Sequence, residues 1–163
     1  MKNLFLIAII VLGFSGVSFG QVKAIATASA NIITPISITK DVDMKFGNVA
    51  VIATAGTLVL SPTGGRTATG GVTIPATTGI VSAASFTVNG QADYTYAITL
   101  PSTHTIKFGA LSMIVDGFNT PALKVLTGGS EIILVGATLH VGASQATGLY
   151  VSETPFDVTV NYN

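Results

Sequence analysis

The chain has 163 residues, of which seven are Lys or Arg and seven are Asp or Glu, so its formal net charge at pH 7 is zero. Only 9% of the residues are charged and the basic ones are scattered, which excludes the clustered basic surface that nucleic-acid binding requires. The chain has no cysteine, which excludes disulfides, thiol catalysis and zinc sites built on cysteine.

The first twenty residues are typical of a cleaved signal peptide. Lys2 supplies a positive charge, residues 4–12 are apolar, and the small residues Ser18 and Gly20 precede the expected cleavage point. The apolar run is too short for a membrane span, which needs about twenty apolar residues. We therefore expect residues 1–20 to be removed, with export to the periplasm, the cell surface or the medium and no stable membrane span afterwards.

Residues 21–163 are expected to form one all-β domain. Short stretches rich in Thr, Val, Ile and Ala alternate apolar and polar residues, and turn signals separate them about every eight to twelve residues. Strands are expected at residues 24–31, 32–39, 44–52, 57–61, 81–89 and 94–100, as two strands within 105–118, as a pair around Gly136 within 131–141, and at 156–162. Residues 61–71 are expected to be a glycine-rich surface connection. Because an alternating strand has one apolar face that a facing sheet can bury, we expect an Ig-like or jelly-roll-like β-sandwich of short antiparallel strands.

No motif indicates catalysis, a cofactor or a metal. His104 is expected in a turn and His140 on a polar strand face, both facing solvent, and their spacing is not that of metal ligands. Asp41 and Asp43 are expected to be turn residues, although their oxygens could also hold calcium. The chain lacks the G-x-S-x-G motif of a serine nucleophile, and residues 61–71 lack the lysine and helix of a phosphate-binding loop. We expect a protein that is not an enzyme.

The most informative patterns lie at the two ends of the expected domain. Small apolar residues alternate with polar ones near Gln21, and apolar residues alternate again in the last strand. The first set is a candidate donor or first strand and consists of Ala24, Ala26, Ala28, Ala30 and Ile32. The second set is a candidate assembly face and consists of Phe156, Val158, Val160 and Tyr162.

The chain resembles the domain family DUF4402. The resemblance is carried by residues 30–38, 44–47, 86–90, 135–139, 141–143 and 148–150 and by the closing strand. Three features are also similar, more distantly, to spore coat U-like domains of archaic chaperone–usher pilins: Phe46-Gly47, the late Gly148-Leu149-Tyr150 and the last strand. Those domains are Ig-like sandwiches that lack one strand and receive it from the N-terminus of the next subunit.

This resemblance implies an exported structural or cell-surface protein of a Gram-negative envelope, pilin-like if it assembles by strand donation. Its partners would then be further copies of itself or a periplasmic chaperone. The strand at residues 24–32 either closes its own sandwich or completes that of a neighbour.

Two alternatives come from other classes of protein. One is a monomeric binding module for envelope glycan or another matrix ligand, using the loops around Gly64 and Gly128 and a stacking surface of Tyr94, Tyr96 and Tyr150. The other is a small outer-membrane β-barrel, although the expected strands are shorter and poorer in aromatic residues than such barrels require.

Overall fold

The computed structural model describes residues 20–163, so the predicted signal peptide lies outside the described residues except for Gly20. The chain divides into a unit that ends at Ile32 and a domain of Ile33–Asn163. Residues 20–32 are exposed and form no helix or strand. The domain contains eleven β-strands and one short 3-10 turn, with no α-helix among the described residues. This confirms the all-β prediction.

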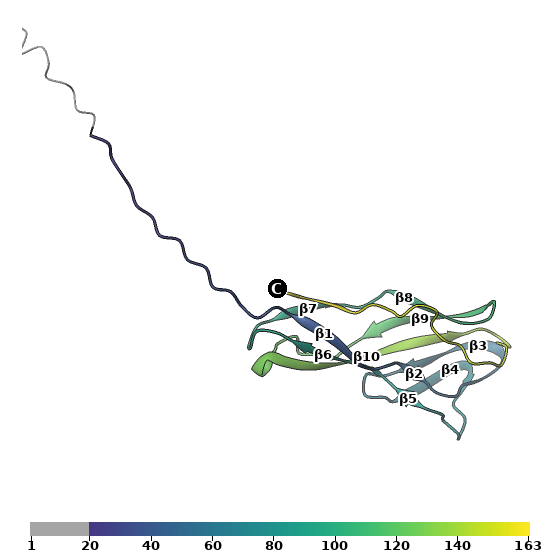
Figure 1. The fold of residues 1–163 in the computed structure, drawn as a ribbon. Helices are drawn as coiled ribbons and strands as arrows, with labels where there is room; N and C mark the ends of the chain where they lie inside the picture. The colour runs from purple at the N-terminus through teal and green to yellow at the C-terminus, as the bar shows by residue number, and fades with distance from the viewer. Residues whose placement is uncertain (1–19) are drawn as a thin grey trace, which may run out of the picture. The chain divides into compact units, whose positions relative to one another are not determined.

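The strands follow one another along the chain as drawn in Figure 1. Their bounds are β1 (Ser37–Val42), β2 (Lys45–Phe46), β3 (Ala50–Leu60), β4 (Arg66–Thr73), β5 (Val81–Ser82), β6 (Ala84–Asn89), β7 (Tyr96–Thr99), β8 (Thr103–Phe108), β9 (Leu111–Asn119), β10 (Ser130–Val141) and β11 (Thr159–Tyr162).

All pairings are antiparallel and form three sheets. The largest sheet has seven strands, with β1, β6, β10, β3 and β4 in that order and with β9 and β8 joined to it through β10. The other two sheets are the pairs β7–β11 and β2–β5. The described residues contain no helix that is long and apolar enough to cross a membrane.

Strand β10 is the central strand of the large sheet and pairs with three other strands. Its first half pairs with β6, and its second half lies between β3 and β9. Gly136 marks the change, because a Cβ atom there would lie only 2.7 Å from the backbone nitrogen of Pro62 and would collide with the carbonyl oxygen of Leu60. The prediction of two strands around Gly136 is therefore wrong: the glycine permits a close backbone approach within one long strand.

The two halves of β10 contribute to two hydrophobic cores. The first core lies where β6 and the first half of β10 face the β7–β11 pair, which makes this part a β-sandwich. Its fully packed members are Ala84, Phe86, Val88, Tyr96, Leu126, Ile133 and Val135. The second core fills the curl of the large sheet and contains Leu58, Val72, Val115, Ala137, Leu139 and Val141. Met44 and Phe118 pack against both cores and join them.

A buried tyrosine anchors the loop before β10. The Tyr96 side chain is 0% exposed, and its hydroxyl donates a hydrogen bond of 2.6 Å to Oε2 of Glu131. The same carboxylate accepts hydrogen bonds from the backbone N–H groups of Leu123 and Lys124, at 2.7 and 3.1 Å. Lys124 has a φ of 62°, a left-handed conformation that these bonds stabilise.

Three further predictions need correction. The expected strands at residues 44–52 and 57–61 are divided differently, since Lys45–Phe46 is β2 and Ala50–Leu60 is the single strand β3. Residues 61–71 are not one surface connection, because only 61–65 form the turn and Arg66–Thr73 is strand β4. The Arg66 guanidinium fixes the start of this strand by donating hydrogen bonds to the carbonyl oxygens of Phe46 and Asn48, at 2.8 and 3.0 Å. Residues 24–31 form no strand, and the first strand of the domain begins at Ser37. Alanine side chains bury little apolar area, so pairing this segment with a single edge of its own domain gains little.

Candidate assembly site

The candidate site lies between the first and last strands of the domain. Strand β1 pairs only with β6, and β11 pairs only with β7. These two strands approach each other closely, yet no backbone hydrogen bond joins them within the described chain. Figure 1 shows β1 and the C-terminal strand near the same end of the domain. Each strand therefore has one unpaired edge, and the two edges are neighbours.

Apolar side chains flank these edges. The residues of both strands that point inward are only partly buried, although they pack against the first core. They are Ile36 and Ile38 on the β1 side and Phe156, Val158, Val160 and Tyr162 on the β11 side. The predicted single face of residues 156–162 is confirmed, because these four alternate with the exposed Asp157, Thr159 and Asn161. We call the two unpaired edges and these six side chains the edge site.

Tyr162 fastens one end of the edge site. Its hydroxyl donates a hydrogen bond of 2.7 Å to the carbonyl oxygen of Thr34 and accepts one of 2.6 Å from the backbone N–H of Gln91. The backbone N–H of Thr34 in turn donates to Oε1 of Gln91 at 3.2 Å. Gly90 leaves room for this clamp, since a Cβ atom there would collide with the Tyr162 hydroxyl. The last strand thus holds the start of β1 in place, and the two strands run in opposite directions.

The sequence predicts Tyr162 as a candidate residue but not its partners Thr34 and Gln91. Bonds from a side chain to backbone groups far away in the sequence leave no pattern in the sequence. The one usable signal is Asn89-Gly90, a turn dipeptide directly after a strand, where a glycine often marks a close approach.

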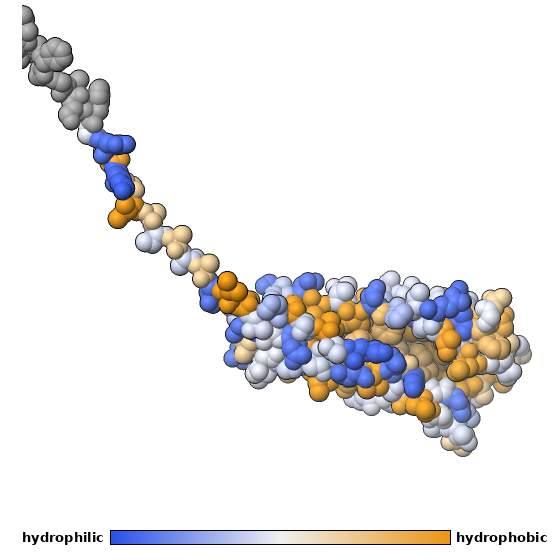
Figure 2. All heavy atoms as spheres, viewed as in Figure 1, coloured by the Kyte–Doolittle hydropathy of each residue, from blue (hydrophilic) through white to orange (hydrophobic). Residues whose placement is uncertain are grey.

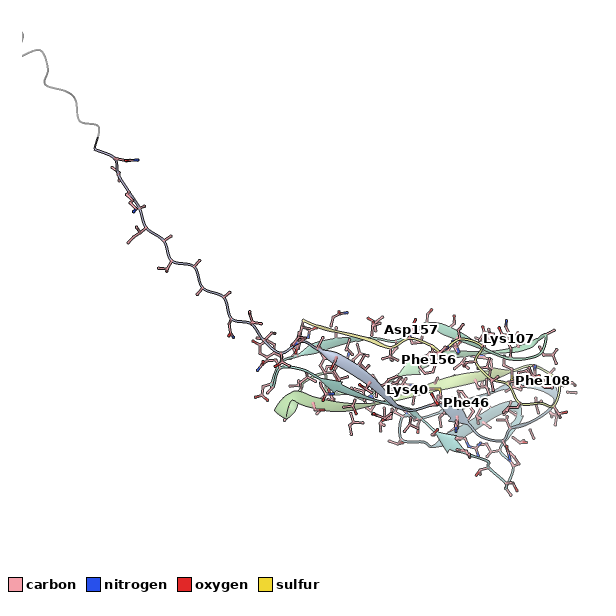
Figure 3. The ribbon with its side chains drawn as sticks, viewed as in Figure 1. Lys40, Phe46, Lys107, Phe108, Phe156 and Asp157 are labelled. Atoms are coloured by element: carbon pink, nitrogen blue, oxygen red, sulfur yellow. The ribbon has the colours of Figure 1, made fainter. Side chains whose placement is uncertain are left out.

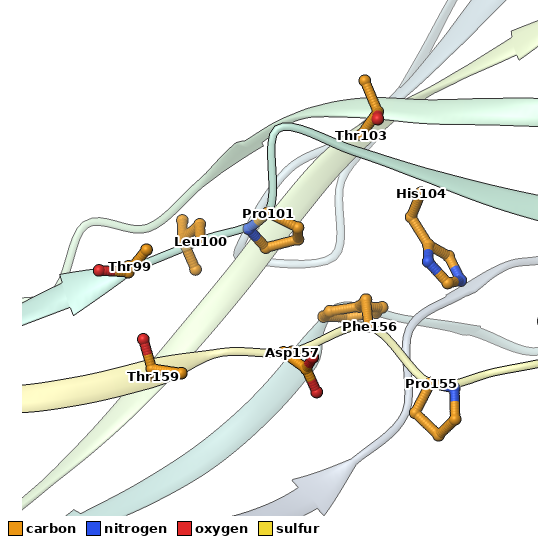
Figure 4. A pocket seen from close by; sticks show the side chains of 9 residues that line it. All are labelled: Thr99, Leu100, Pro101, Thr103, His104, Pro155, Phe156, Asp157 and Thr159. Carbon is orange, nitrogen blue, oxygen red and sulfur yellow. The ribbon is translucent and has the colours of Figure 1, made fainter.

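A pocket opens where β7 and β11 separate. Pairing of these strands stops at Thr99 and Thr159. Beyond that point lies an open cavity of about 350 Å³, shown in Figure 4. Its lining consists of Thr99, Leu100, Pro101, Thr103, His104, Pro155, Phe156, Asp157 and Thr159. Residues 155–158 alternate between exposed and half-buried like a strand, but they are not paired as one.

His104 lies beside this pocket, in strand β8 and not in the predicted turn. Its ring is half-buried with its centroid 5.6 Å from that of Phe156, and its Nε2 lies 2.8 Å from Oγ of Ser152. A serine hydroxyl beside an imidazole is the first contact of a nucleophile–base pair. Among the described residues, however, no carboxylate forms a hydrogen bond with this ring. The contact fastens the segment before β11 against β8.

The remaining polar residues singled out in the sequence form local pairs. His140 is exposed, as predicted, and its Nε2 lies 2.8 Å from Oδ1 of Asp116. Asp41 lies within β1, not in a turn, and its Oδ2 accepts a hydrogen bond from the Thr87 hydroxyl. Asp43 does follow β1, where a hydrogen bond from Lys40 and the positive charge of that lysine lower the pKa of its carboxyl.

The predicted tyrosine stacking surface does not form. Tyr96 is fully buried and cannot meet a ligand. Tyr94 packs edge-on against Tyr162, whereas Tyr150 packs against Phe108 and donates a hydrogen bond to the carbonyl oxygen of Ala146. Burial of Tyr96 in the first core is the reason that the three rings share no surface.

Comparison with protein families places the chain beside a family known by its sequence profile. The profile of a family described as "Domain of unknown function (DUF4402)" matches residues 36–162, which include all eleven strands. No curated protein and no solved structure matches the chain.

Proposed function

The chain belongs to the DUF4402 family, and from that premise we propose that it is an exported structural subunit of a Gram-negative envelope that assembles by strand donation, without enzymatic activity. The observation that carries this proposal is the edge site. Unpaired strand edges bind extended segments, because backbone groups on the edge supply hydrogen bonds and alternate side chains enter the core. Here two such edges are neighbours, so one inserted strand would pair on both sides.

The donor in this proposal is the N-terminal segment of a second copy, residues 21–32, which we call the arm. Every even-numbered residue from Val22 to Ile32 is apolar, and the odd-numbered residues between them are polar except Ile25. Val22 and Ile32 are more than nine-tenths exposed, at 96% and 95%. Apart from Ile25, the arm therefore has the alternation of a strand that buries one face, while residues 20–32 contain no strand.

The lengths of arm and acceptor are compatible. Residues 22–32 would extend over about 36 Å at 3.3 Å per residue, and the seven residues of the 156–162 face over about 23 Å. The arm is thus long enough to cover the whole edge site.

Export fits the same proposal. Open edges with half-buried apolar side chains invite wrong pairing, so a subunit of this kind needs them covered until it meets its neighbour. A periplasmic chaperone that occupies the edge site would do this, and the final location would be the cell surface.

The test compares two variants of the chain from Gln21 to Asn163. Ala26→Asp/Ala28→Asp places carboxylates on the inward positions of the arm, where burying an unpaired charge is costly. Thr27→Asp/Ser29→Asp adds the same charge to the outward positions. We expect wild type and the outward variant to form polymers in light scattering and negative-stain images. The inward variant should be a monomer that binds an added peptide of residues 21–35.

Either of two results would contradict the proposal. One is equal polymerisation of the inward and outward variants. The other is an inward variant that stays monomeric and does not bind the peptide, which would mean that the edge site accepts no strand.

A further inference from the structure

The domain has two ends, and both carry exposed apolar side chains outside the edge site. The proximal end is the one with the Tyr162–Thr34 clamp, and there Tyr94 packs against Tyr162 while Leu123 is 80% exposed. Backbone hydrogen bonds between Tyr94 and Leu126 and between Tyr96 and Lys124 hold the segment that contains Tyr94 against the loop that contains Leu123. Figure 1 shows the C-terminus at this end.

The distal end is built by the β8–β9 turn and the loop before β11. Figure 3 shows Phe108 at the end of the domain away from the C-terminus. Its exposed apolar residues are Phe108, Leu111, Leu149 and Val151.

Internal contacts fix this distal surface. Val151 exchanges two backbone hydrogen bonds with Lys107, and the Phe108 and Tyr150 rings lie 5.7 Å apart. Gly148 packs so closely on the Phe108 ring that a Cβ atom there would lie 2.5 Å from it. A fixed surface with Leu149 79% exposed is typical of an interaction site. Figure 2 shows hydrophobic residues at this end of the domain.

We infer that the distal end binds the proximal end of the next copy, so that subunits join head to tail through this contact as well as through the arm. This inference rests on the proposed function. The occupant is a second copy of the chain, for the geometric reason that follows.

The connection between the arm and its own domain is too short to hold neighbouring subunits apart. Ile32 is its last residue, and Thr34, only two residues later, is already fixed by Tyr162 in the donor domain. Two extended residues span about 7 Å. Wherever Ile32 leaves the edge site of the acceptor, the proximal end of the donor must therefore lie directly against that acceptor.

The direction of the inserted arm decides which end it meets. Strands β1 and β11 run in opposite directions, so an inserted strand can run either way. An arm that runs parallel to β1 leaves at the distal end and brings the proximal end of the donor onto Leu149 and Val151. An arm that runs parallel to β11 leaves at the proximal end and brings two proximal ends together. Only the first direction covers the exposed distal surface. In that direction each copy contacts the next in the same way, so the assembly grows as a filament and does not close into a dimer.

Because the chain has no cysteine, cross-linking between introduced cysteines tests this contact without interference from native thiols. In the chain from Gln21 to Asn163, Leu123→Cys and Leu149→Cys are made singly and together. Each protein is allowed to assemble, treated with a short bismaleimide and fully denatured before electrophoresis. We expect the double variant to give a ladder of cross-linked species well beyond a dimer, and each single variant to remain largely monomeric.

The matched control pairs Leu149→Cys with Val42→Cys, because Val42 is exposed and pairs with Ser85, which lies beside the middle of β10 and not at an end. That pair should give no ladder. A ladder from the control equal to that from the end-to-end pair would overturn the inference, since it would show cross-linking without a specific contact. A dimer from Leu123→Cys alone would also overturn it, since it would show that proximal ends meet.

A charge variant separates this inference from the strand-donation proposal. Leu149→Asp should slow polymerisation at least tenfold, because a carboxylate would be buried in the contact. When added to the inward arm variant, it should leave the affinity for the 21–35 peptide within twofold. If the peptide binds and Leu149→Asp polymerises at the wild-type rate, the end-to-end contact is wrong and strand donation stands. If no peptide binds, strand donation itself has failed.

Discussion

Tyr96 shows how one side chain couples the core to its surroundings. Its phenol is buried and hydrogen-bonded to Glu131. Burial first, and then the bond to the carboxylate, raise the pKa of Tyr96 above its usual value near 10. An unfolded chain loses this proton near pH 10, whereas the folded chain keeps it to higher pH. Above about pH 10 the folded state binds more protons, so its free energy of unfolding falls as pH rises.

We therefore expect Tyr96→Phe to change both the size and the pH dependence of stability. At pH 7 the free energy of unfolding should fall by about 1–3 kcal/mol, because Glu131 loses a hydrogen-bond partner beside the core. Between pH 9.5 and 11 the variant should lose stability less steeply than wild type. Urea unfolding across this pH range measures both effects. Equal slopes would show that Tyr96 does not carry the alkaline dependence.

At the scale of elements, local alternation in the sequence predicts most strands. Residues 81–89 and 94–100 contain β6 and β7, and residues 105–118 contain most of the β8–β9 hairpin. Alternation is a local signal, since one apolar face must be buried wherever the partner strand lies. It also predicts correctly which side chains of residues 156–162 share a face.

The errors at this scale come from residues whose role depends on distant neighbours. Glycine predicts a turn at residues 61–71 and around Gly136, but Gly70 and Gly71 lie within strand β4 and Gly136 lies against Leu60 and Pro62. Likewise, the sequence shows that the last strand must pair but not with which strand. The unpaired edges of β1 and β11 follow from strand order, which is set by contacts far apart along the chain.

The arm allows a quantitative prediction at the same scale. Replacing Ala28 by Val in the 21–35 peptide adds two methyl groups on the inward face. Each buried carbon contributes about 0.8 kcal/mol, so binding to the inward arm variant should strengthen by roughly 5-fold to 15-fold, the lower value applying if burial is partial. Thr27→Val in the same peptide is the matched control, because its side chain would point outward. Fluorescence anisotropy of labelled peptides measures both affinities, and equal gains for the two peptides would show that the arm has no preferred face.

At the scale of the whole molecule, the low charge and the two ends belong to one argument. Within the described domain, charged side chains form ion pairs with one another. Examples are Lys107 with Glu153 at 2.7 Å and Lys40 with Asp43 at 2.7 Å. The contacts proposed for assembly are backbone hydrogen bonds at the edge site and apolar side chains at the two ends. Neither kind of contact requires a net attraction between charges.

Assembly of this chain should therefore depend little on ionic strength. Salt screens charge interactions over a Debye length that shortens from about 30 Å at 0.01 M to about 3 Å at 1 M. A contact driven by opposite charges would weaken steeply over this range, and one opposed by like charges would strengthen. With a formal net charge of zero and 9% charged residues, we expect the polymerisation rate of the chain from Gln21 to Asn163 to change less than threefold in sodium chloride. Light scattering measures this rate, and sodium sulfate provides the comparison, since it strengthens apolar burial and should accelerate assembly. A steep decline in sodium chloride would mean that charged residues, and not the edge site and the apolar ends, hold neighbouring copies together.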